Sequence, residues 1–76
     1  MVNVELLKAE MEDVGITKAH LAKKCNMSRQ TLNNKLENPK TITAEDALAI
    51  ASALRINDEK RLMSIFFAEN VEKNFN

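Results

Sequence analysis

The chain has 76 residues, no net charge and 45% hydrophobic residues. A chain of this length forms one small domain with a thin core, so we predict a single domain over residues 1–76. One cysteine and one histidine exclude a disulfide framework and argue against a structural zinc site, which favours a reducing cytosol. The sequence has no basic-then-apolar signal segment and no apolar run long enough to span a bilayer, so we expect a cytoplasmic protein.

The composition favours an all-α fold. Strong helix formers are abundant, only one glycine and one proline occur, and no run alternates in the way a strand requires. We therefore predict a compact bundle of about five short helices.

The charges are distributed unevenly along the chain. Residues 17–40 contain six basic side chains and one acid, a net charge of +5, whereas the remaining residues contain five basic and ten acidic side chains, a net charge of −5. The six basic residues are Lys18, Lys23, Lys24, Arg29, Lys35 and Lys40. Such asymmetry is typical of a protein that binds a polyanion through one face.

The first helix is predicted over residues 4–13, with Asn3 as its N-cap. Gly15 follows the helix and suits a left-handed C-terminal turn. Apolar residues recur at helical spacing and are expected to face the core: Val4, Leu7, Met11 and Val14.

Two further helices are predicted close together, each after a hydroxyl-bearing N-cap. Thr17 begins the second helix and Ser28 begins the third, which ends before Pro39 because the residue before a proline avoids helical geometry. Asn26 lies between them and adopts the left-handed conformation more readily than any residue except Gly. This arrangement follows the helix-turn-helix pattern. The inward residues are expected to be Leu21, Ala22, Cys25, Leu32 and Leu36.

The fourth helix is predicted to begin after Thr43, with Asp46 placed to complete a capping box. The fifth is predicted to begin near Asn57 or Asp58 and to cover about residues 58–70. The inward residues of the fourth helix are expected to be Ala47, Ile50, Ala51 and Leu54.

The segment ITKAHLAKKCNMSRQTLNNKL, followed by TAEDALAIASAL, resembles the Cro/CI-type (lambda-repressor-like) helix-turn-helix regulators of phages. The resemblance covers about residues 4–56, with the helix-turn-helix at about 17–37. The small Ala22 fits it, because two helices cross closely at such a position. Asn26 departs from the glycine that is usual there, and Lys35 stands where an apolar residue is commoner. The resemblance implies a transcription regulator, a repressor in the cytoplasm and nucleoid of a bacterial host, that binds a double-stranded DNA operator.

The resemblance also implies which side chains would contact DNA in the major groove. The expected base-reading residues are Arg29, Gln30, Asn33 and Asn34. Arginine can bind guanine, and glutamine or asparagine can bind adenine. The expected phosphate contacts are Thr17, Lys18, Ser28, Lys35, Asn38, Lys40 and Thr41. The alternative is that this polar helix face is merely solvated.

No set of residues suggests catalysis. Cys25 and His20 are five positions apart and so do not share a helix face, and Cys25 belongs to the predicted apolar stripe. We find no nucleophile–base pair, phosphate loop or carboxylate pair, and we expect neither enzyme activity nor a cofactor.

Apolar residues of the fifth predicted helix surround nearly its whole circumference, more than a thin core can bury. We expect the surplus to form a protein interface, most simply that of a homodimer: Leu62, Met63, Phe66 and Phe67. The alternative is that all of these side chains pack inside. A second function also stays open, in which the same fold acts as a modulator or antirepressor of a partner repressor protein.

Overall fold

The computed structural model describes residues 2–67 and shows helices joined by short turns. No strand occurs within that range, so the predicted all-α fold is confirmed. The elements are α1 (Val4–Val14), α2 (Lys18–Lys24), α3 (Arg29–Glu37), the short 3-10 helix η1 (Pro39–Thr41), α4 (Ala44–Ala53) and α5 (Glu59–Phe66).

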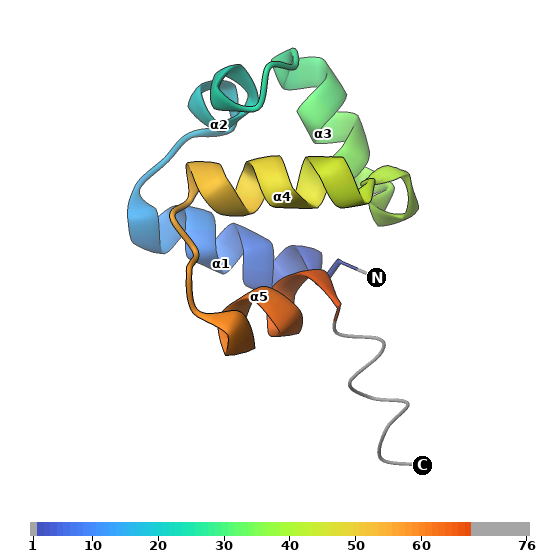
Figure 1. Cartoon of the computed structure of the whole chain (residues 1–76). Coiled ribbons are helices and arrows are strands. Elements are labelled where there is room, and N and C mark those ends of the chain that lie inside the picture. The colour runs from blue at the N-terminus through green and yellow to red at the C-terminus, as the bar shows by residue number, and fades with distance from the viewer. Residues whose placement is uncertain (1, 68–76) are drawn as a thin grey trace.

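Helix α4 lies in the middle of the bundle (Figure 1). Helices α2 and α3 lie together on one side of it and contact each other, and α1 and α5 pack together on the other side. Within residues 2–67 no helix is long and apolar enough to cross a membrane.

Every α-helix begins at a side chain that accepts a hydrogen bond from a backbone amide of the first turn. Such caps satisfy amides that have no partner inside the helix, so they determine where each helix begins. Thr43 and Asp46 form a full capping box at α4, as predicted. The other four caps were predicted as well: Asn3, Thr17, Ser28 and Asp58. For α5 the sequence left Asn57 and Asp58 open, and the cap is Asp58.

Three helices end in the same way, with a left-handed residue followed by an apolar one. The left-handed residues are Gly15 (φ 81°), Asn26 (φ 63°) and Arg55 (φ 58°). After each of them, the next amide donates back to the carbonyl five positions earlier, as Ile56 N does to Ala51 O at 2.9 Å. Gly15 and Asn26 were predicted from their residue types. Arg55 was not, because arginine has no special tolerance for positive φ.

One contiguous core fills the space between the helices. Its fully buried large side chains come from four different helices: Leu7, Leu21, Leu32 and Ile50. The predicted inward residues of α3 and α4 are all buried, which confirms those faces. Val14 was expected in the core and is 49% exposed. It is the last residue of α1, at the edge of the bundle beside an open groove that Arg55 also lines.

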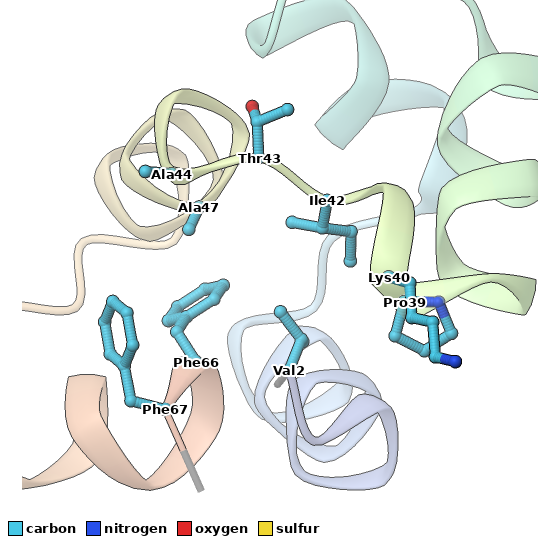
Figure 2. Close-up of a pocket in the computed structure, with 9 residues that line it drawn as sticks. All are labelled: Val2, Pro39, Lys40, Ile42, Thr43, Ala44, Ala47, Phe66 and Phe67. Atoms are coloured by element: carbon cyan, nitrogen blue, oxygen red, sulfur yellow. The ribbon is translucent and has the colours of Figure 1, made fainter. Parts of the chain in front are cut away.

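The two phenylalanines at the end of α5 have different environments. Phe66 is only 2% exposed, because its ring packs in the core beside α4. The prediction that it belongs to a protein interface was therefore wrong. Figure 2 shows Phe66 between Phe67 and Val2. These side chains and Ala47 line a groove of about 350 Å³. Phe67 is 36% exposed and forms the C-cap. Helix α5 thus ends at Phe66, and residues 68–70 of the predicted helix lie outside the described residues.

Candidate nucleic-acid interface

The candidate interface is built on the crossing of α2 and α3. The two helices contact each other, Ala22 on α2 is 1% exposed, and Leu21 and Leu32 are fully buried in the core. The amide of Met27 donates to Ala22 O at 3.0 Å, which closes the turn around the left-handed Asn26. The apolar side of α3 is therefore buried against α2, and its polar side faces solvent.

Three of the four predicted base-reading residues are exposed on α3: Arg29, Gln30 and Asn34. Arg29 and Gln30 lie in the first turn, directly after the Ser28 cap. Among residues 2–67, no hydrogen bond or ion pair engages any of these three side chains. Their donors and acceptors are therefore available to a ligand.

Asn33, the fourth predicted base reader, is half-buried and already has partners. Lys18 Nζ on α2 donates to Asn33 Oδ1 at 3.0 Å, and Asn33 Nδ2 donates to Glu37 Oε2 at 3.4 Å. Both polar atoms of its amide are thus used inside the protein.

The predicted phosphate contacts lie in the segments before and after the exposed side of α3 as well as at its start. The hydroxyls of Thr17 and Ser28 accept backbone amides as helix caps, at 3.1 and 3.0 Å. Asn38, Lys40 and Thr41 are exposed in the loop after α3 and in η1. The start of α2 lies beside the middle of α3 through the Lys18–Asn33 contact, and η1 lies beside its last turn through the Lys35–Thr41 contact.

Lys35 was predicted to contact phosphate, but its ammonium is engaged within the protein. Its Nζ lies 2.8 Å from Asp46 Oδ2 and also donates to Thr41 O at 3.2 Å. The hydrogen bond from Lys35 holds the pKa of Asp46 below its ordinary value, against the opposing effect of burial. Lys35 thus joins α3 to η1 and to the start of α4, at a position where an apolar residue is commoner.

Sequence reasoning did not find the Lys35–Asp46 pair, because eleven positions separate the two residues and no local periodicity links them. It also missed the most exposed large apolar side chain among the described residues, Leu48, which is 67% exposed on α4.

Cys25 and His20 differ in burial. Cys25 packs against the core, and burial, with a smaller contribution from the charge of Asp46, raises the pKa of its thiol. The thiol is therefore protonated at neutral pH, which agrees with its prediction as a structural residue. His20 is exposed on α2.

The predicted protein interface on α5 is smaller than expected. Met63 is 39% exposed and Phe67 is 36% exposed, four positions apart, so both lie on one side of the helix end. Leu62 is half-buried against the core. We call Met63 and Phe67 the α5 patch.

Two capped helices in contact across a tight turn, with exposed polar side chains along the second that no residue among 2–67 engages, define a helix-turn-helix DNA-binding protein. The family model HTH_3, described as Helix-turn-helix, matches residues 7–60. The chain belongs to this family of Cro/CI-type proteins and is a DNA-binding transcription regulator of that kind. No curated protein and no solved structure matches the chain.

Proposed function

We propose that this protein is a phage-type repressor that recognises a specific operator by inserting the first turn of α3 into the major groove. The observation that carries the proposal is the availability of Arg29 and Gln30, which stand exposed and unpaired within the described residues. A guanidinium can bind guanine O6 and N7 together, and a side-chain amide can bind adenine N6 and N7. The half-site would therefore contain a guanine and an adenine.

Contacts to phosphate would fix the position of α3 in the groove. Lys18 with Thr17 would contact one stretch of backbone, and Lys40 with Asn38 another, since one pair belongs to the start of α2 and the other to the segment after α3. Ser28 and Thr41 complete the proposed set: their exposed hydroxyls donate to Thr31 Oγ1 at 2.9 Å and to Asn38 O at 2.7 Å, and would turn to phosphate on binding. Lys35 is left out of it because its ammonium is paired with Asp46.

We propose further that two copies bind the operator as a symmetric dimer through the α5 patch. Two-fold symmetry would place two recognition helices about 34 Å apart, one turn of duplex. The position of α5 supports this proposal, because α5 lies on the other side of α4 from α2 and α3 (Figure 1). An interface on α5 would therefore leave α3 accessible to DNA. An interface with two-fold symmetry buries one patch against itself, which suits a small apolar surface.

The proposal places the protein in the cytoplasm of a bacterial host, on its nucleoid. The alternative function, modulation of a partner repressor by the same fold, predicts that the chain alone selects no DNA sequence.

The test is selection of duplexes from a random double-stranded DNA library by the purified chain, followed by binding measurements at increasing salt. We expect enrichment of a two-fold symmetric site and a slope of log K against log salt of roughly −3 to −6 per complex, since several phosphates release counterions. The control is the double variant Arg29→Ala/Gln30→Ala, which should not enrich that site. No enriched sequence together with a flat salt response would contradict the proposal.

A further inference from the structure

The hydrogen bonds around Asn33 determine how its amide is oriented. A lysine ammonium has only donors and a carboxylate has only acceptors. Asn33 Oδ1 must therefore face Lys18, and Nδ2 must face Glu37, at 3.0 and 3.4 Å. The opposite orientation would place an amide N–H group against an ammonium.

This orientation conflicts with base reading. To bind adenine, an asparagine presents its oxygen to N6 and its nitrogen to N7 at the same time. Asn33 has both atoms engaged, and turning to a base would leave the partly buried Lys18 ammonium without its acceptor. The neighbouring Asn34, of the same residue type, is exposed and carries no such bonds within the described part of the chain.

We propose that Asn33 is a positioning residue, which holds the Lys18 ammonium in place for a DNA phosphate, and that Arg29, Gln30 and Asn34 alone read the bases. The inference rests on the proposed operator binding. Lys18 has three N–H donors, of which Asn33 takes one, so two remain for phosphate oxygens. A lysine side chain loses much rotamer freedom when it is ordered, and a bond made before DNA arrives removes that loss from the binding step.

Glu37 completes the chain of contacts from the other side. It lies one helical turn after Asn33, and its carboxylate accepts a hydrogen bond from Asn33 Nδ2. The start of α2 is thereby linked to α3 through side chains as well as through the apolar core.

The test measures the salt slope and the sequence preference of variants on the enriched operator and on single-base-pair changes of it. Asn33→Ala removes no charge. We nevertheless expect its slope of log K against log salt to be shallower than that of the wild type, by up to about one per protomer, and so to approach the slope of Lys18→Ala. Both variants should bind every sequence roughly tenfold more weakly, without loss of discrimination. The double variant should bind no more weakly than Lys18→Ala alone, because the two residues act as one unit.

Asn34→Ala is the matched control. It should keep the wild-type salt slope and lose discrimination at one base pair. Asn33→Gln, whose longer amide still reaches the flexible Lys18 side chain, should restore the slope. Thermal melting of each variant separates these effects from unfolding.

The inference is overturned if Asn33→Ala keeps the wild-type slope, if it loses discrimination at one base pair, or if its effect adds to that of Lys18→Ala. A wild-type chain that enriches no operator would instead refute the proposed function. The two failures are therefore distinguishable.

Discussion

Lys35 Nζ on α3 lies 2.8 Å from Asp46 Oδ2 on α4, with both side chains only about one-fifth exposed (21% and 18%). The same carboxylate oxygen accepts the amide of Thr43 at 3.0 Å and so caps α4. One acidic side chain therefore determines where α4 begins and also attaches the last turn of α3 to it. Side-chain contacts thus join α3 to α4 in addition to the apolar core.

This pair should make stability depend on pH. Asp46 has a lowered pKa in the folded protein, so its contribution is present above the unfolded-state pKa of about 3.9 and is lost as the pH falls through the lower folded value. Asp46→Asn keeps a cap acceptor and removes the charge. We expect it to lower the free energy of unfolding by about 1 kcal/mol at pH 7, and the difference to disappear at lower pH, once Asp46 is protonated in the folded wild type. Urea unfolding of both proteins from pH 7 to pH 2.5 measures this, and an equal difference at every pH would contradict it.

Base reading by the first turn of α3 predicts losses that depend on sequence. Arg29→Ala and Gln30→Ala should each weaken binding to the selected operator by about 1–3 kcal/mol and relax the preference at one base pair. Lys40→Ala is the control, because loss of a phosphate contact weakens all sequences alike. Titrations against single-base-pair variants of the operator distinguish the two effects. If Arg29→Ala left the preference unchanged, α3 would lie differently in the groove.

The α5 patch predicts a difference between two adjacent phenylalanines. Phe67→Ser should abolish self-association and leave the helical content intact, because Phe67 is 36% exposed. Phe66→Ser should instead destabilise the fold by at least the 3–5 kcal/mol expected of a large-to-small core substitution, because Phe66 is 2% exposed. Sedimentation and circular dichroism of both variants measure these outcomes. A wild-type chain that stays monomeric at high concentration, both free and on operator DNA, would refute the dimer.

The crossing of α2 and α3 should tolerate no larger residue at Ala22. This side chain is 1% exposed, so Ala22→Leu should destabilise the protein by about 1–3 kcal/mol through overpacking. Ala19→Leu adds the same atoms to an exposed position of the same helix and should change stability by less than about 0.5 kcal/mol. Thermal unfolding of the two variants gives the comparison. Equal stabilities would show that the helices can separate without loss.

Local features of this protein were predictable because their causes lie within a few residues of each other. A cap such as Ser28 satisfies an amide three positions later, at 3.0 Å, so residue type and spacing are sufficient to place the start of α3. Asn26 could be placed in a left-handed turn for the same reason. The helix-turn-helix, and with it the exposed position of Arg29 and Gln30, follows from such short-range chemistry and from the apolar stripe of α3.

Contacts between distant residues could be decided only by how the helices cross. Lys18 and Asn33 are fifteen positions apart, so nothing in the spacing distinguishes Asn33 from the exposed Asn34. Phe66 and Phe67 are equally apolar, and apolar residues surround α5, so the periodicity favours no single inward side. The way α5 packs against α1 decides which ring is buried, and the buried ring is that of Phe66.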